Sequence, residues 1–100
     1  MKGIVDIFDQ FGNLNIGYIL ENDATLDFTI YNIYGDVVWE YTANSTNGYG
    51  LAGPHYDDDV AVHWDGRSSK GDKVLSGVYY IFVTNNTTGE TTKMKVAVVW

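Results

Sequence analysis

The stretch WDGRSSKGDKVLSGVYY, residues 64–80, brings together side-chain types that binding loops and catalytic loops use. Asp65 can accept hydrogen bonds from backbone N–H groups further along the chain, which would fold the loop over itself. Gly66 and Gly71 allow backbone conformations that a residue with a Cβ avoids. Trp64 ends an apolar, strand-like run, so we expect its indole to close one end of a hydrophobic core. We therefore interpret this stretch as a structural turn rather than a site.

Two more residues belong to the expected turn. Arg67, the only arginine, is expected to pair with Asp65, Asp72 or a loop carbonyl. Gly77 is expected to let the chain turn into the aromatic run VYYIFV. The residues assigned to the structural turn are Trp64, Asp65, Gly66, Arg67, Gly71 and Gly77.

An acidic run, HYDDD at residues 55–59, is the candidate metal site. Ca²⁺ prefers several oxygen ligands in one cage, and Asp65 could add a ligand to those of Asp57, Asp58 and Asp59. However, the D-x-D-x-D-G spacing of an EF-hand is absent, and adjacent carboxylates on an extended chain point to opposite sides. We expect no cofactor, with Ca²⁺ at these three aspartates as the alternative.

Catalysis would need a nucleophile or an acid–base pair, and no such pattern is recognisable. His55 and His63 are the only histidines. His63 adjoins Trp64 on a strand-like run, so it is expected to point away from the core. The sequence contains no G-x-S-x-G turn, H-E-x-x-H helix or glycine-rich phosphate loop. We expect a protein that is not an enzyme.

Aromatic side chains suggest a different binding function. Tyr49 and Tyr56 lie in the long connection at 44–59, and with Trp39 they could form a platform on which sugar rings stack. Aromatic residues in strands more often pack in the core or cover a sheet face. Carbohydrate binding, with Tyr49 and Tyr56 as candidate ligand-binding residues, is therefore kept as the alternative function.

The composition excludes several partners. Six basic and thirteen acidic residues give a net charge of −7, and such an acidic surface repels the phosphates of nucleic acids. There is no cysteine, so neither a disulfide nor a thiolate site can form. No apolar run is long enough to span a bilayer. We expect neither nucleic-acid binding nor membrane insertion.

Alternating apolar and polar residues predict strands throughout the chain, and no segment repeats apolar residues at helical spacing. The alternating runs are NIGYIL, TLDFTIYN, VVWEY and TTKMKVAVVW, separated by turn signals such as YGD and NNTTGE. With KGIVDIFD, VAVHW and VYYIFV, about seven strands predict an all-β, immunoglobulin-like, two-sheet antiparallel sandwich. Residues 44–59 are too long for a hairpin loop and are expected to form a functional loop or a floppy insertion.

Two runs, VYYIFV and VAVVW, are apolar on both faces. This composition suits strands in the middle of a sheet. At an exposed sheet edge the same runs would promote self-association.

Three blocks of sequence occur in a suggestive order: IGYILENDATLDFTIYNIYGDVV, VHWDGRSSKGDKVLSGVYYIFV and GETTKMKVAVV. Together they resemble the immunoglobulin-like domain of the flagellar hook-capping protein. They are also similar to the C-terminal sorting domains of type IX secretion cargo, which share the IYNxxG and SGVYY segments. The resemblance covers about residues 14–99, and VDIFDQFGN stands where family members often have a proline-rich YPNPF-like start.

The resemblance implies a single immunoglobulin-like domain, residues 1–100, taken from the C-terminal end of a larger exported or cell-surface bacterial protein. The implied function is non-catalytic and serves docking, secretion or assembly. The expected partners are a neighbouring domain of the parent chain, secretion or assembly machinery, or a second copy bound through sheet edges. The expected location is extracellular or on the cell surface, with the export signal elsewhere on the parent protein. A flagellar hook-cap role is a further alternative.

Overall fold

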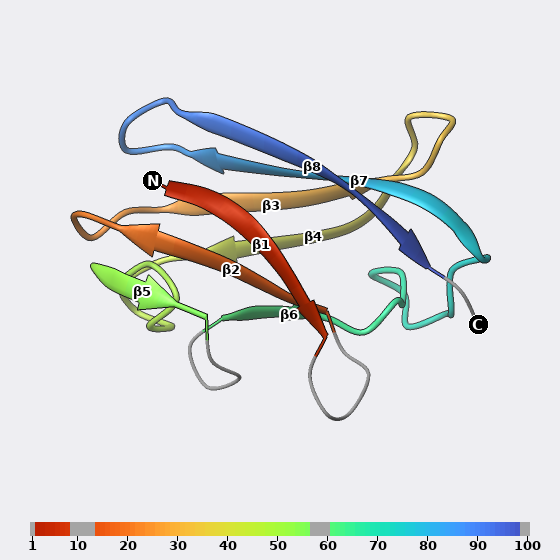
Figure 1. The fold of residues 1–100 in the computed structure, drawn as a ribbon, viewed down its shortest axis with the longest axis horizontal. Helices are drawn as coiled ribbons and strands as arrows, with labels where there is room; N and C mark the ends of the chain where they lie inside the picture. Colours follow the sequence, from red (N-terminus) through yellow and green to blue (C-terminus); the bar gives the residue numbers. More distant parts are fainter. Residues whose placement is uncertain (1, 9–13, 57–60, 99–100) are drawn as a thin grey trace.

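Two antiparallel sheets make up the fold (Figure 1). The computed structural model describes residues 2–8, 14–56 and 61–98, with the backbone alone described at 2–8 and 15. The first sheet contains β1 (Lys2–Phe8), β2 (Leu14–Leu20), β5 (Gly53–His55) and β6 (Val62–Trp64). The second contains β3 (Leu26–Tyr31), β4 (Val37–Ala43), β7 (Gly77–Asn85) and β8 (Thr91–Val98), in the order β4-β3-β7-β8.

Strands β5 and β6 share one edge of β2, so the first sheet has three strand positions. Residues 18–20 of β2 pair with β5, residues 14–16 pair with β6, and β1 occupies the other edge. The sandwich thus has seven strand positions, three in one sheet and four in the other. The predicted all-β, immunoglobulin-like, two-sheet fold is confirmed.

The core lies between the sheets because successive side chains of a strand point to opposite faces. The burial of β3 alternates from residue to residue, as the sequence pattern predicted. The largest fully buried side chains are Tyr18, Phe28, Ile16, Leu26, Ile30, Ile81 and Val83, all on β2, β3 and β7. In the part of the chain that the structure describes, no helix is long and apolar enough to cross a membrane.

The connection at 44–59 contains a strand that the sequence pattern did not predict. Pro54 lies in β5, which pairs with β2 over only three residues. So short a strand leaves no readable alternation, and a proline argues against a strand except at an edge, where β5 lies. The expectation of a floppy insertion is wrong for residues 44–56, which are held by strand pairing and by a network of hydrogen bonds.

The two runs that are apolar on both faces take different positions in the second sheet. VYYIFV lies in β7, between β3 and β8, as expected for a central strand. VAVVW begins at Val96 in β8, and β8 is the last strand of its sheet. Of the two positions left open for such a run, its described residues 96–98 therefore take the sheet edge. Alternation shows that both faces are apolar, whereas the strand order depends on the whole chain.

Candidate functional site

Trp64 lies at the end of β6 with its indole inside the sandwich. Only 2% of its surface is exposed, and its ring meets that of Tyr79 edge to face, with 5.6 Å between the centroids. Its Nε1–H donates a hydrogen bond of 2.9 Å to the carbonyl oxygen of Arg67. The same side chain thus fills the core and binds the backbone of the turn that follows.

The rest of the turn is held by its own backbone and by Arg67. The Asp65 Oδ1 accepts the Arg67 N–H at 3.1 Å, and the Arg67 Nη1 donates to the Gly71 carbonyl at 2.9 Å. The Arg67–Asp65 ion pair is 3.9 Å long, and both side chains are about half exposed. An exposed pair of this kind contributes at most about 1 kcal/mol. The backbone hydrogen bonds therefore define the turn.

The glycines of the turn have different roles. Gly66 and Gly71 have φ angles of 76° and 92°, which only glycine adopts without cost. Gly77 begins β7, its φ is not positive, and an added Cβ would meet no atom within 4 Å. The expectation that Gly77 is needed for the turn is therefore wrong, because the backbone there is ordinary strand.

The turn also covers a sheet edge. The Ser69 N–H donates to the Val38 carbonyl of β4 at 2.9 Å. This bond satisfies one acceptor on the outer edge of the second sheet, where an unpaired strand would otherwise invite another chain. The stretch at 64–80 thus connects the two sheets through the Trp64 ring and through the β4 backbone.

A second buried network joins β2 to the 44–56 segment. The Tyr18 hydroxyl donates to the Tyr49 carbonyl at 2.6 Å, and burial raises the pKa of Tyr18 far above its ordinary value. His55 is buried, stacks on the Tyr18 ring at 4.5 Å, and its Nε2 lies 2.7 Å from the Leu51 carbonyl. The imidazole of the HYDDD run is thus part of the core.

Of the four candidate metal ligands, the structure describes only Asp65. Asp57, Asp58 and Asp59 lie outside the residues that the structure describes. Asp65 is exposed and accepts the backbone N–H of its own turn. Within the described ranges, no three His, Cys, Asp or Glu side chains form a group that could hold a metal ion.

Of the three aromatic residues named for the carbohydrate alternative, Tyr56 lies apart from Tyr49 and Trp39. Tyr56 packs on Gly17, where an added Cβ would lie 2.6 Å from its ring, one position beyond the inward-facing His55. Tyr49 instead meets Tyr41 edge to face, and Tyr41 stacks on Trp39, each pair with centroids 5.9 Å apart. The sequence carried no signal for Tyr41. It grouped Tyr56 with Tyr49, but β5 lies between them in the chain, and Tyr56 packs on Gly17 of β2 instead.

The second histidine and the buried polar side chains have these surroundings. His63 is half-buried on β6. Among the described residues, every buried side-chain nitrogen or oxygen has a hydrogen-bond partner, as is usual for buried polar groups.

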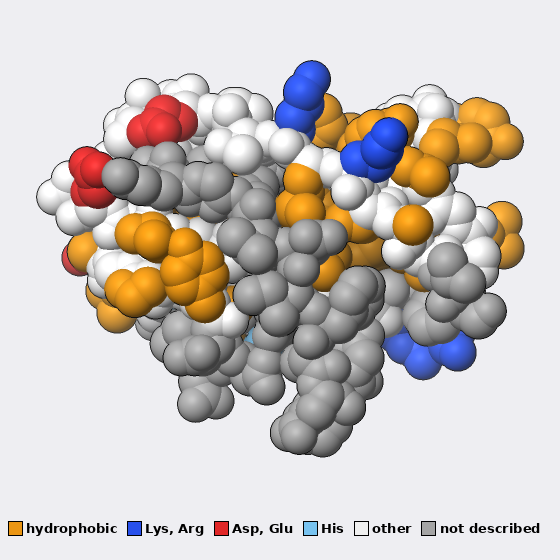
Figure 2. All heavy atoms as spheres, viewed as in Figure 1, with side chains coloured by type: hydrophobic (Ala, Val, Ile, Leu, Met, Phe, Trp, Pro, Cys, Tyr) orange, Lys and Arg blue, Asp and Glu red, His pale blue; other side chains and the backbone are white. Residues whose placement is uncertain are grey.

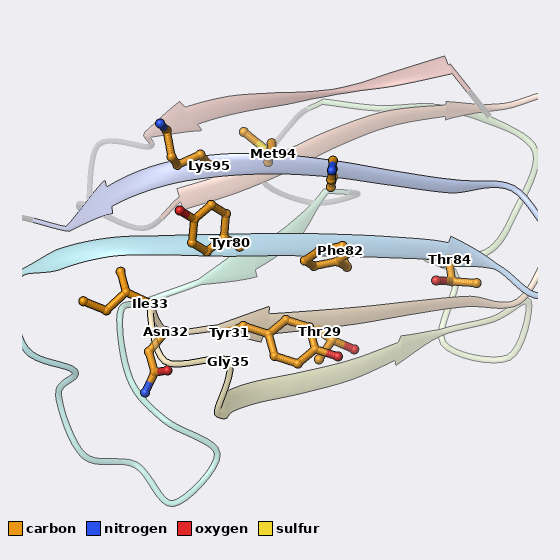
Figure 3. Close-up of a pocket in the computed structure, with 11 residues that line it drawn as sticks. Thr29, Tyr31, Asn32, Ile33, Gly35, Tyr80, Phe82, Thr84, Met94 and Lys95 are labelled. Carbon is orange, nitrogen blue, oxygen red and sulfur yellow. The ribbon is translucent and has the colours of Figure 1, made fainter.

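A groove runs over the outer face of the second sheet (Figure 3). We call it the aromatic groove and define it by Tyr31, Ile33, Tyr80, Phe82, Lys93 and Lys95. The rings of Tyr31 and Phe82 meet at 88° with centroids 5.3 Å apart. Figure 3 shows these rings on adjacent strands, with Lys95 on β8 beside Tyr80.

Exposed apolar side chains gather at one end of the same sheet. Tyr31 pairs with Tyr80 and Val37, and Gly77 pairs with Val98, so these ends of β3, β4, β7 and β8 lie together. Figure 2 shows hydrophobic side chains at the right of the molecule, where the β3–β4 turn lies in Figure 1. We define this apolar end by the exposed residues Ile33, Tyr34, Val37, Leu75, Val78 and Tyr80.

The apolar end is unusual within this molecule. In the described part of the chain, only one other large apolar residue, Leu51, is exposed. Exposed apolar residues scattered singly are ordinary, whereas clusters of them are common at interaction surfaces. The sequence signal for the groove was VYYIFV, of which the outward-facing Tyr80 and Phe82 line it. The strands that lie beside this run could not be assigned from the sequence.

The fold and this surface define an immunoglobulin-like sandwich domain with an uncovered apolar end. No protein-family model matches the sequence, and no curated protein matches it. Among solved structures, the chain is similar to part of PorZ, described as an essential bacterial surface component of the type-IX secretion system of Porphyromonas gingivalis. The TM-score is 0.52 at 18% identity, over 86% of this chain and 10% of the PorZ chain. The similarity is one of fold, and this chain spans about a tenth of PorZ.

Proposed function

We propose that this domain is a non-catalytic accessory module of an exported or cell-surface bacterial protein, and that it docks on a neighbouring domain or on secretion or assembly machinery. The observation that carries the proposal is the apolar end, where exposed side chains such as Ile33 and Val78 gather. Burying such side chains against a partner is favourable by about 25 cal/mol per Å². Docking would therefore explain why these apolar side chains are exposed in the isolated domain: the partner buries them.

Two further observations support this function. The described residues satisfy their own buried polar groups, which suits a structural module better than an active site. The similar structure belongs to a surface component of a secretion system, and the matched part is a small share of a longer chain. An accessory domain within a larger surface protein agrees with both.

The test compares the apolar end with a matched residue elsewhere. Serine replaces Ile33, Val78 and Tyr80 together in the full-length parent protein, and Leu51→Ser serves as the control because Leu51 is also exposed. We expect the triple variant to fold normally, to keep any catalytic activity of the parent, and to be displaced from the cell-surface fraction. An unchanged location both in this variant and after deletion of residues 1–100 would contradict the proposal.

Carbohydrate binding is the second candidate, favoured by the row Trp39–Tyr41–Tyr49. These rings are only partly buried at the side of the sandwich. Native gels containing a panel of polysaccharides would show retardation that Tyr49→Ala removes and that Tyr56→Phe leaves intact. Unretarded migration across the panel would rule this function out.

A further inference from the structure

We propose that the aromatic groove binds an acidic, extended polypeptide segment of a partner protein. This inference rests on the proposed docking function and names the chemistry of the partner. It is carried by the two lysines that flank the aromatic side chains of the groove, and by the spacing at which rings and ammonium groups repeat along the strands.

Within the described part of the chain, the two lysines of the groove have no counter-charge. Lys93 and Lys95 are exposed on the outer face of β8, and neither ammonium forms a hydrogen bond or ion pair with another described residue. The chain has only six basic residues and a net charge of −7. Two positive charges that no described side chain pairs, beside the exposed ring of Tyr80 and the half-buried ring of Phe82, are therefore a local exception. They favour a partner that brings negative charge.

Two described acids of the same outer face, Glu40 and Asp27, are separated from these lysines or engaged elsewhere. Glu40 opposes Thr29, Thr29 opposes Phe82, and Phe82 opposes Lys93 across the sheet. Three inter-strand steps of about 4.8 Å separate the backbones of Glu40 and Lys93 by about 14 Å. At physiological salt, exposed charges further apart than about 8 Å are largely screened. Asp27 lies on the same face, but its carboxylate already accepts hydrogen bonds from the side chains of Thr42 and Asn86.

The spacing of the groove matches an extended chain. Tyr80 pairs with Lys95 and Phe82 pairs with Lys93, so each row offers one ring and one ammonium group. The rows are two residues apart, or about 6.6 Å along the strand. Side chains on one face of an extended partner repeat at the same distance. A partner with acidic residues at every second position would place a carboxylate near each lysine.

The ring geometry argues against a sugar in this groove. A sugar ring stacks on an open, flat aromatic face, whereas the rings of Tyr31 and Phe82 meet edge to face at 88°. A second copy of the chain is also disfavoured. In a symmetric dimer the same patch meets itself, which would bring Lys93 and Lys95 of both copies into one interface.

The experiment titrates the ¹⁵N-labelled domain with a synthetic octapeptide of alternating glutamate and valine, up to 5 mM. A peptide with glutamine in place of glutamate is the control probe. We expect saturable amide shifts at Tyr31, Tyr80, Phe82, Lys93 and Lys95, and weaker binding as salt rises. Lys93→Gln with Lys95→Gln should weaken binding about tenfold, because it removes both positive charges of the groove. Lys70→Gln, which removes an exposed charge from the turn, should change it less than twofold.

Four outcomes would overturn the inference: no saturable shifts at 5 mM, equal binding of the glutamine peptide, the same shifts on concentrating the protein alone, or tighter binding of polygalacturonate at these residues. The third would identify a second copy, and the fourth a saccharide. The serine variant of the apolar end is read out by the location of the parent protein and not by peptide binding, although its Ile33 and Tyr80 also line the groove. If it displaces the parent protein while the peptide fails to bind, docking stands and only the acidic partner is wrong.

Discussion

The indole of Trp64 donates its N–H to the carbonyl oxygen of Arg67, three residues further along the chain, at 2.9 Å. One buried ring therefore fixes both the end of the core and the start of the turn. The turn fixed in this way places the Ser69 N–H on the Val38 carbonyl at the edge of β4. A substitution at Trp64 should therefore disturb both the packing of the core and the conformation of the turn.

Replacing Trp64 tests this double role. Trp64→Ala should lower the free energy of unfolding by about 3–5 kcal/mol, because it leaves a large cavity. Trp64→Phe keeps most of the ring but leaves the Arg67 carbonyl without its donor, and should cost about 1–3 kcal/mol. Urea unfolding followed by circular dichroism measures both. Lys70→Ala, at an exposed turn position, should stay within 0.5 kcal/mol; a comparable loss there would show that the assay does not report on the core.

Gly50 should tolerate no side chain. A Cβ at this position would collide with the Ala24 carbonyl oxygen and lie 2.6 Å from the Asn44 backbone. The Gly50 carbonyl also accepts the Ala24 N–H at 2.8 Å. Gly50→Ala should therefore cost about 1–3 kcal/mol or more by overpacking, measured by thermal unfolding.

Gly77→Ala is the matched control for that change. Its Cβ would meet no atom within 4 Å, and its backbone φ is not positive. We expect its melting temperature to equal or slightly exceed that of the wild type, since alanine restricts the unfolded chain. If Gly77→Ala destabilised the protein as much as Gly50→Ala, the account of both glycines would be wrong.

The stability of the fold should fall in alkaline solution because of Tyr18. The ordinary pKa of a tyrosine is 10.0, and burial raises the pKa of Tyr18 in the folded protein. The unfolded chain therefore releases its proton first. The stabilisation is complete below pH 10 and is lost as pH rises towards the higher folded-state value, at up to about 1.4 kcal/mol per pH unit.

Tyr18→Phe isolates this contribution. The variant loses the hydroxyl that donates to Tyr49 and should cost about 1–3 kcal/mol at neutral pH. Its stability should then fall less steeply above pH 10, although burial also raises the pKa values of Tyr41 and Tyr79, so some slope should remain. Denaturant unfolding between pH 8 and 11 measures the slopes, and identical slopes would refute the role of Tyr18.

Calcium should leave the domain unchanged. We expect the melting temperature to shift by less than about 1 °C between 5 mM Ca²⁺ and excess chelator, because a ligand stabilises only by binding the folded state. A Ca²⁺-dependent rise that Asp58→Ala abolishes would instead establish a metal site in the run 57–59.

Much of the fold was predictable because its signal is local. The alternation in TLDFTIYN assigned Leu26, Phe28 and Ile30 to the inside, and all three are fully buried. β5 was not predictable, since three residues with a proline carry no such pattern. The turn at Trp64 was readable from its residue types, whereas the aromatic groove depends on which strands become neighbours.

By itself the sequence determined which residues face inward, because a strand turns every second side chain to the same side. It also determined the acidic charge and the absence of cysteine. Only the tertiary structure decided that Tyr49 and Tyr56 point to different surfaces, that VAVVW begins in an edge strand, and that Lys93 lies beside Phe82. These relationships join residues distant in the chain, and their register is set by the packing of all the strands together.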